Sequence, residues 1–521
     1  MELKLPPGVS AAQFDAALKA FEGVVGVDWV LATDLDRDTY ADIYSPGSET
    51  EHMPSAAVAP ADVEQVRALV RLANEHRVPL WPISRGKNLG YGAAAPRMSG
   101  TAVIDLGRMR KILEVDPALG YCVVEPGVSF FDLHEHIVAN NIPLWMSVPG
   151  NAWGSVMGNA IERGIGYTNM GVHTRNICGM EVVLPDGDLV RTGTGAMTGS
   201  RSWHLFPYGF GPSWDQMFVQ SSLGIVTKMG LWLAPEPESS LSLSMAIPEE
   251  DDIAWVVETL QPMRMSGLIN QSLFVPSWLG KMSVIGQRSQ FYQGKGAMPD
   301  DVVKTIIAEH KLGYWSVNIR FYDDAGVNAA KAEVVKRAFA KHTDHAFDEH
   351  AWKRGDPVIA MDPSFGVPSA VPLQMANWPG GRGGHLGFSP VVPPTREHVM
   401  SQLKRTRKRF AEFDFDFYAS FTIHERFANN IAMILFDRDD DEQVQRARAM
   451  FAVLVADAKE AGYGEYRTHL SWMDSVAATF DFNDHALRRL NEKVKDALDP
   501  NGILSPGKQG VWPATYRDQR A

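Results

Sequence analysis

The loop from Pro82 to Gly92 is the segment that most constrains the fold of this chain. Its sequence, Pro-Ile-Ser-Arg-Gly-Lys-Asn-Leu-Gly-Tyr-Gly, places three glycines, a lysine and an asparagine within eleven residues. Helical periodicity over 63–74 precedes the loop, and a strand pattern over 101–105 follows it. Glycines let the backbone approach a ligand closely, and successive amide N–H groups can then point at one anion. The loop therefore suits a pyrophosphate, and an ordinary glycine-rich turn is the alternative.

Two common phosphate-binding patterns do not describe this loop. A Walker A loop needs Ser or Thr after the Gly-Lys pair, whereas Asn88 follows Lys87 here. The glycines also do not form a Gly-x-Gly-x-x-Gly motif at the start of a long helix.

Composition indicates a globular protein of more than one domain. The 521 residues are enough for two or more domains with sizeable cores, and the 45% hydrophobic content with a mean hydropathy of −0.16 is ordinary for a globular chain. The net charge of −12 argues against a nucleic-acid partner.

Cysteine content and hydropathy predict a cytoplasmic protein without a membrane span. Cys122 and Cys178 are the two cysteines, too few for a disulfide framework. The first residues hold no apolar run typical of a signal peptide, and no stretch of about twenty apolar residues occurs.

Periodicity predicts an α+β chain with a boundary at Pro235-Glu-Pro-Glu-Ser239. Helices are expected over 11–21, 58–74, 130–140, 251–263, 330–341, 396–413 and 441–461. Strands are expected over 101–105, 112–115, 121–125, 180–184, 188–192, 221–233, 241–246, 314–321, 417–423 and 431–436. The charged run 437–442 is interpreted as a solvated turn that caps the helix after it.

No metal site is expected. His134 and His136 are two residues apart on a predicted helix, so they face different directions. Three histidines and three acidic residues occur between His342 and His350, but their spacing enforces no tetrahedral geometry, and a solvated loop is the preferred interpretation over a zinc site.

Seven motifs, taken together and in order, resemble the vanillyl-alcohol oxidase / p-cresol methylhydroxylase flavoprotein family, and within it the bacterial eugenol oxidases. The resemblance covers nearly the whole chain. The motifs are Gly86-Lys-Asn-Leu-Gly-Tyr-Gly92, Gly154-Ser-Val-Met-Gly-Asn159, Gly164-Ile-Gly-Tyr167, Phe206-Pro-Tyr-Gly-Phe-Gly-Pro212, Gly384-His-Leu-Gly-Phe-Ser-Pro390, Gly464-Glu-Tyr-Arg-Thr-His469, and Asp499-Pro-Asn-Gly-Ile503 with Pro506-Gly-Lys508.

The resemblance implies an α+β, two-domain FAD-binding fold with an α+β cap domain. The FAD-binding domain is expected over 1–237, the cap over 238–496, and a C-terminal return to the FAD-binding domain over 497–521. The residues expected to bind FAD are Gly86, Lys87, Asn88, Leu89, Gly90, Gly154, Ser155, Gly158, Asn159, Gly224, Ile225, Val226 and Lys508. His385 stands where some members link a histidine covalently to the 8α-methyl of the flavin, so a covalent bond to FAD is expected there.

The resemblance also places Tyr91, Tyr466 and Arg467 at a phenolate-binding site. Two phenolic O–H donors and one permanent cation lower the pKa of a bound phenol and stabilise its anion. A hydride then leaves the benzylic carbon more easily and passes to flavin N5, which gives a para-quinone methide. Water adds to this species, or its side chain loses a proton. The expected substrates are 4-alkylphenols, 4-allylphenols, 4-hydroxybenzyl alcohols and bulkier lignin-derived phenols.

The chain departs from the family pattern around the substrate. Gly150 stands where oxidase-type relatives carry an aspartate that acts as a base beside the flavin. Glycine at position 150 also removes bulk over the flavin, and Gly387 replaces a residue that is aromatic in some relatives. A roomier pocket is therefore expected, with Tyr167 among its residues. Glu425 and its neighbour His424 are the candidates to supply the missing base.

The resemblance leaves the electron acceptor open. An oxidase that passes electrons to O2 and forms H2O2 is the leading interpretation, and a cytochrome c-linked methylhydroxylase is the alternative. A flavin-binding module without turnover and a sugar or aldonolactone oxidase are further alternatives, although neither accounts for Tyr466 and Arg467. A homodimer or larger homo-oligomer is expected.

Overall fold

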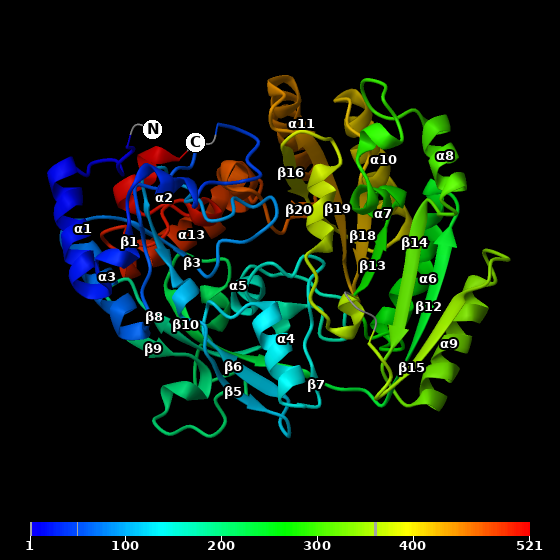
Figure 1. The fold of residues 1–521 in the computed structure, drawn as a ribbon, viewed down its shortest axis with the longest axis horizontal. Helices are drawn as coiled ribbons and strands as arrows, with labels where there is room; N and C mark the ends of the chain where they lie inside the picture. The colour runs from blue at the N-terminus through cyan, green and yellow to red at the C-terminus, as the bar shows by residue number, and fades with distance from the viewer. Residues whose placement is uncertain (1–2, 49, 359–361, 521) are drawn as a thin grey trace.

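The computed structural model describes residues 3–48, 50–358 and 362–520. The helices and strands form two regions that lie side by side (Figure 1). The first region comprises the described residues of 3–237 and 470–520, and the cap region comprises those of 238–469. The two ends of the chain lie close together on the first region (Figure 1).

Two small sheets build the first region. One sheet has the order β1 (Val30–Leu31), β2 (Ala57–Val58), β4 (Ala102–Asp105) and β3 (Leu80–Ile83), and β3 and β4 are parallel. The other has the order β5 (Ile112–Asp116), β6 (Tyr121–Val124), β10 (Ile225–Trp232), β8 (Ile177–Val183) and β9 (Leu189–Arg191), and all its pairs are antiparallel. The glycine-rich loop therefore leaves the carboxyl end of β3.

Helices complete the first region. Asp62 caps α3 by accepting a hydrogen bond from Gln65 N, and α3 buries Val66, Leu69 and Val70 against the first sheet. The helices of this region are α1 (Ala11–Val25), α2 (Asp34–Asp38), α3 (Val63–His76), α4 (Phe130–Ala139), α5 (Val156–Ile161), α12 (Met473–Ala478) and α13 (Phe482–Leu498). The region also contains a short antiparallel pair of strands, β7 (Leu144–Trp145) and β11 (Ala234–Pro235).

Two antiparallel sheets build the cap region. The first has the order β14 (Trp315–Phe321), β12 (Ser239–Ile247) and β15 (Asp348–Lys353). The second has the order β13 (Leu273–Pro276), β18 (Ala419–Ile423), β19 (Ala428–Asp437), β17 (Pro390–Val392) and β20 (Gly464–Glu465), and β16 (Gly383–Phe388) also pairs with β19. Six helices pack on these sheets: α6 (Ile253–Met265), α7 (Trp278–Ile285), α8 (Asp300–Glu309), α9 (Ala325–Phe339), α10 (Arg396–Glu412) and α11 (Asp441–Glu460).

The hydrophobic cores bear on where the chain returns to the first region. Residues 470–476 divide between two cores. Trp472 and Val476 belong to the large cap core, whereas Leu470 and Met473 pack with Trp81 and Val103 of the first region. We therefore propose a return near residue 470 instead of 497, whereas the division at 237/238 stays a prediction.

A buried lysine fixes the C-terminal segment after the return. Lys495 Nζ donates to Asp499 Oδ2 (2.7 Å), to the carbonyl of Ser222 (2.7 Å) and to that of Leu504 (2.6 Å). Leu80 N in turn donates to the carbonyl of Ile503 (2.7 Å), so the segment extends the edge of β3 beside the glycine-rich loop.

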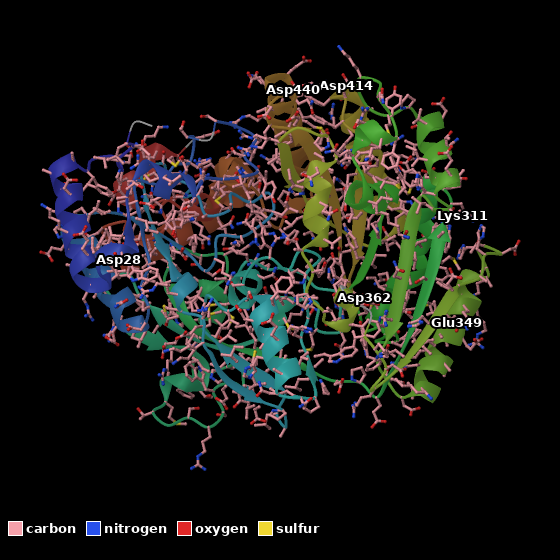
Figure 2. The ribbon with its side chains drawn as sticks, viewed as in Figure 1. Asp28, Lys311, Glu349, Asp362, Asp414 and Asp440 are labelled. Atoms are coloured by element: carbon pink, nitrogen blue, oxygen red, sulfur yellow. The ribbon has the colours of Figure 1, made fainter. Side chains whose placement is uncertain are left out.

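The predicted helices and strands are found, with corrections to two of their starts. The strand expected from Ser221 begins only at Ile225, in β10. Val58, expected at the start of a helix, lies in β2, because α3 begins only after its capping residue Asp62. The charged run 437–442 forms the expected cap, since Asp440 accepts from the backbone N–H groups of Glu442 and Gln443. Charged side chains such as Asp440, Asp414 and Lys311 lie at the outer edge of the molecule (Figure 2). No described helix is long and apolar enough to cross a membrane.

Candidate active site

A cavity of about 820 Å³ lies between the two regions. The glycine-rich loop, α5 and the residues around Ile225 line it from the first region. Strands β13, β16, β18 and β19 line it from the cap, and Tyr466 and Arg467 follow β20 into it. The expected site residues that the structure brings to this lining are Gly86, Lys87, Asn88, Leu89, Tyr91, Gly150, Gly154, Ser155, Gly158, Asn159, Tyr167, Gly224, Ile225, Val226, His385, Tyr466, Arg467 and Lys508.

The glycine-rich loop is held by its own asparagine. Asn88 Oδ1 accepts from the backbone N–H groups of Tyr91 (3.1 Å) and Ala93 (3.0 Å), while Asn88 Nδ2 donates to the carbonyl of Ala93 (3.0 Å). Gly90 has φ +78°, and a Cβ there would clash with the ring of His385. Position 90 therefore requires glycine for its backbone conformation and for the close approach of His385.

A second small-residue loop is tied to the first. Ser155 Oγ donates to Ser84 Oγ (2.7 Å) and accepts from Gly158 N (2.9 Å), which caps α5. A Cβ at Gly158 would clash with Ser84 Oγ, so glycine allows the two loops to pack closely. Lys508 from the C-terminal segment reaches the same wall, where its Nζ lies 2.5 Å from Glu162 Oε1.

His385 is buried and has unused ring nitrogens. It lies on β16 opposite Leu435, with 2% of its surface exposed. Neither Nδ1 nor Nε2 has a hydrogen-bond partner among the described residues. Burial, with a smaller contribution from His469, lowers the pKa of His385 to about 4. The imidazole is therefore neutral at physiological pH, and its nitrogen lone pair is free to react.

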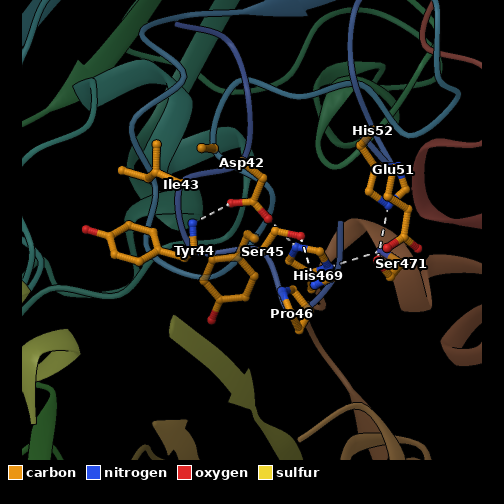
Figure 3. A network of polar contacts seen from close by, with 12 residues as sticks. Asp42, Ile43, Tyr44, Ser45, Pro46, Glu51, His52, His469 and Ser471 are labelled. Atoms are coloured by element: carbon orange, nitrogen blue, oxygen red, sulfur yellow. Dashed lines mark hydrogen bonds and ion pairs between the residues drawn. The ribbon is translucent and has the colours of Figure 1, made fainter. Parts of the chain in front are cut away.

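A buried acid–base pair lies near His385. His469 Nε2 is 2.7 Å from Asp42 Oδ2, and both side chains are almost fully buried. Figure 3 shows this pair next to His52, which hydrogen-bonds Ser471 at 3.1 Å. His469 lowers and Asp42 raises the pKa of His385, so the pair contributes to the electrostatic environment of that imidazole.

Tyr91, Tyr466 and Arg467 form a compact cationic cluster. The Arg467 guanidinium carbon lies 4.1 Å from the Tyr91 ring centre and 5.5 Å from the Tyr466 ring centre. Burial raises the pKa of Tyr466 to about 12, and Arg467 opposes this rise. Burial also disfavours the charge on Arg467, but Tyr466 and Tyr91 keep the Arg467 pKa above its ordinary value. The cluster thus presents hydroxyl donors and a permanent cation to the cavity.

Glu465 does not neutralise this cation. Its Oε1 accepts from Ser389 N (2.8 Å), and its Oε2 has no hydrogen-bond partner among the described residues. Burial raises the pKa of Glu465 to about 8, so the carboxyl is mostly protonated at neutral pH. The positive charge of Arg467 is therefore available to an anion in the cavity.

Three expected residues lie outside the cavity lining. Gly90 and Gly387 stand just behind it, since Gly90 abuts His385 and a Cβ at Gly387 would lie 3.3 Å from Tyr91 Oη. Glu425 is farther away, and it pairs with Arg264 Nη2 (2.7 Å) and Arg175 Nη1 (3.2 Å). The structure thus does not bring Glu425 to the cavity lining.

Its neighbour His424 is also removed from the lining. The His424 ring stacks on Phe427 with ring centres 4.3 Å apart, and burial lowers its pKa to about 3. The structure gives no support to the suggestion that Glu425 or His424 replaces the missing base, because Glu425 is ion-paired and neither residue lines the cavity.

The space opposite Gly150 is filled instead of open. A Cβ at position 150 would lie 2.9 Å from Tyr167 Oη and 3.3 Å from Tyr167 Cε2. The expectation of extra room at this point is therefore wrong. The sequence analysis also missed Phe274, Tyr418, Thr422 and Met433 in the lining. No strand was expected at Phe274, and for the other three a strand pattern does not show which strand face a cavity will use.

Comparisons with known proteins agree with this geometry. A model described as FAD binding domain matches residues 54–193, and one described as FAD linked oxidases, C-terminal domain, matches residues 369–509. The flavoprotein subunit of 4-cresol dehydrogenase (hydroxylating) from Pseudomonas putida is 35% identical over 516 residues, which covers 97% of each chain. The chain belongs to the vanillyl-alcohol oxidase / p-cresol methylhydroxylase flavoprotein family. It is thus an FAD-linked oxidoreductase with the two-domain α+β fold of that family.

Two solved structures of the family superpose closely on this chain. The 4-ethylphenol oxidase from Gulosibacter chungangensis, in its isoeugenol complex, gives a TM-score of 0.93 at 33% identity and covers 99% of this chain and 100% of its own. The p-cresol methylhydroxylase with substrate bound gives a TM-score of 0.93 at 34% identity and covers 98% of this chain and 99% of its own.

The residues that line the cavity fit FAD, independently of the comparisons with relatives. The glycine-rich loop and the Gly154–Asn159 segment present backbone to the cavity at points where a Cβ would clash. His385 faces the same space with two unpartnered nitrogens, as expected of a side chain whose partner is a ligand.

Proposed function

We propose that this protein oxidises para-substituted phenols at the benzylic carbon and passes the electrons to O2, forming H2O2. The observation that carries the proposal is the Tyr91–Tyr466–Arg467 cluster, which opens into the same cavity as the FAD-binding loops. The names of the relatives support it, since one is a 4-ethylphenol oxidase and another a 4-cresol dehydrogenase.

We assign the pyrophosphate of FAD to Gly86, Lys87, Asn88, Leu89 and Gly90, and the flavin and ribityl part to Gly154, Ser155, Gly158 and Asn159. Gly224, Ile225 and Val226 would flank the adenine half, Lys508 would close the site, and His385 would hold the flavin covalently. The bound FAD would supply the hydride acceptor for the oxidation of the benzylic carbon.

The chain's own residues prepare the substrate for that loss. Arg467 places a permanent charge beside two hydroxyl donors in a water-poor site, where an electrostatic interaction is stronger than in water. A phenol bound there loses its proton more readily, because the cation and the two donors stabilise its anion. Each unit by which the pKa of the phenol falls corresponds to about 1.4 kcal/mol of preference for the anion. The protonated state of Glu465 keeps a competing anion away from Arg467.

A cytochrome c-linked dehydrogenase is the second candidate. The observation that favours it is the 35% identity to a protein named as the flavoprotein subunit of a dehydrogenase. We further propose a homodimer and a cytoplasmic location, as the sequence analysis predicts.

The identity of the acceptor is testable directly. Purified protein supplied with 4-ethylphenol in aerated buffer is expected to consume O2 and form H2O2 in equal amounts, measured with an oxygen electrode and a peroxidase assay. If turnover occurs only after cytochrome c is added, as measured by the reduction of cytochrome c at 550 nm, the protein is a cytochrome c-linked dehydrogenase and not an oxidase.

A further inference from the structure

An arm of the first region exposes several large apolar side chains to solvent. The arm, defined here as residues 193–214, follows β9 and projects beyond it at the edge of the molecule (Figure 1). Its exposed apolar side chains are Met197, Leu205, Phe206, Tyr208, Phe210 and Trp214. The rings of Phe206 and Tyr208 contact each other, with ring centres 5.4 Å apart. The motif 206–212 thus lies on this arm and outside the cavity lining.

Buried contacts anchor the arm to the second sheet of the first region. A Cβ at Gly195 would clash with the indole of Trp203, so the arm packs closely on itself. His204 Nδ1 lies 2.9 Å from the carbonyl of Cys178 on β8. Trp232 on β10 donates from Nε1 to the carbonyl of His204 (2.9 Å). The apolar side chains of the arm therefore have a fixed place on the surface, and they do not belong to a loop without contacts.

The exposed area of the arm is close to what a dimer interface needs. At about 200 Å² for a whole large side chain, the exposed fractions of the six apolar residues amount to about 700 Å². A monomeric soluble protein rarely leaves an apolar patch larger than about 300–600 Å² uncovered. Each partner in a standard protein interface contributes about 800 Å², so the arm supplies most of one side.

The low charge of the arm favours a second copy of this chain as the partner. Arg201 is the single charged residue among its 22 residues, whereas 21% of the whole chain is charged. A charged electron-transfer partner or an anionic membrane surface is recognised by a patch of opposite charge, which the arm lacks. In an isologous contact the same surface meets itself, so like charges would face each other and a neutral apolar surface is favoured. The net charge of −12 makes a neutral contact more important, because two copies repel each other at longer range.

A further exposed apolar group is less suited to such a contact. It lies around the start of α13 and consists of Phe480, Phe482, Leu487 and Leu490. Charged residues separate its members along the chain, since Asp481 pairs with Lys459 Nζ (2.9 Å) and Asp484 pairs with Arg489 Nη1 (3.0 Å). This group therefore offers a matched control for the arm.

We propose that residues 193–214 form the surface through which two copies of this chain associate as an isologous dimer. The inference rests on the homodimer proposed above and names its interface. It is independent of the proposed oxidation of phenols, because none of the arm's six exposed apolar residues lines the cavity that the structure describes.

Analytical ultracentrifugation of the holoenzyme at micromolar concentration tests the interface. Wild-type protein is expected to have twice the 57.5 kDa mass of one chain. The double variant F206S/F210E is expected to weaken the dimer at least about a hundredfold and to sediment as one chain, because each substitution occurs twice in an isologous contact. The matched variant F480S/F482E is expected to stay dimeric. Both variants are expected to keep their FAD and their thermal midpoint, since the replaced side chains are exposed.

The outcomes separate this inference from the proposed oxidation. A wild-type protein that sediments as one chain would overturn the inference together with the homodimer, whereas an F206S/F210E variant that stays dimeric would overturn the interface alone. If the wild-type protein is a single chain that cosediments with vesicles of phosphatidylcholine and phosphatidylglycerol, the arm is a membrane-docking surface and the inference is wrong. Failure of 4-ethylphenol to reduce the flavin of a dimeric wild-type protein would refute the proposed oxidation and leave the interface standing.

Discussion

Replacing Arg467 with alanine is expected to slow reduction of the bound flavin by 4-ethylphenol about a thousandfold at neutral pH, because it removes the cation beside Tyr91 and Tyr466. Without that charge, the pKa of the bound phenol returns toward its value in water, and little phenolate forms. The measurement is the rate of loss of flavin absorbance after rapid anaerobic mixing with saturating 4-ethylphenol.

Two neighbouring variants serve as controls for Arg467→Ala. Arg467→Lys keeps the charge but loses the planar guanidinium, and it is expected to retain an intermediate rate. Glu465→Gln exchanges a mostly protonated carboxyl for a neutral amide, so it is expected to keep the wild-type rate at neutral pH. An alanine variant that reduces its flavin at the wild-type rate with FAD still bound would show that Arg467 does not stabilise the phenolate.

Replacing His385 with alanine is expected to abolish covalent attachment of the flavin completely. His385 is the histidine on the cavity wall whose two ring nitrogens are unpartnered and uncharged. Acid precipitation of the wild-type protein is expected to leave a yellow pellet with a mass increase of one FAD less two hydrogens, as seen by mass spectrometry of the intact chain. The same treatment of His385→Ala is expected to release all flavin into the supernatant.

His424 offers a matched control for this experiment. It is as deeply buried as His385 and also has two unpartnered ring nitrogens, but it lies outside the cavity lining. His424→Ala is therefore expected to keep the covalent flavin. Acid-stable flavin in the His385→Ala variant would disprove the assignment, as would its absence from the wild-type protein.

Much of the fold follows from local sequence signals. The loop at Gly86 to Gly92 could be recognised because its glycines adopt positive φ values and approach other groups closely, which a sequence records as glycine. Helices such as α10 and α11 carry capping residues, Thr395 and Asp440, directly before their first turn. These signals depend on residues within a few positions of each other.

The remaining features depend on partners far apart in the sequence. Glu425 looked free to act as a base, but it pairs with Arg175 and Arg264, which are 250 and 161 residues away. The glycine at position 150 suggested open space, yet the backbone fold brings the Tyr167 hydroxyl into it. Neither contact has a local signal. The Gly150–Tyr167 contact depends on the path of the backbone within the first region, and of the two Glu425 pairs only the one with Arg175 joins the two regions.

The central claim is that the bound substrate must ionise at its phenolic oxygen before hydride leaves. Anaerobic mixing of the holoenzyme with 4-ethylphenol or with its methyl ether, 4-ethylanisole, tests this most directly, because the ether has the same benzylic carbon but no proton to lose. The account predicts that the phenol bleaches the flavin within seconds and the ether leaves it oxidised. Bleaching by both compounds at similar rates would contradict the role assigned to Tyr91, Tyr466 and Arg467.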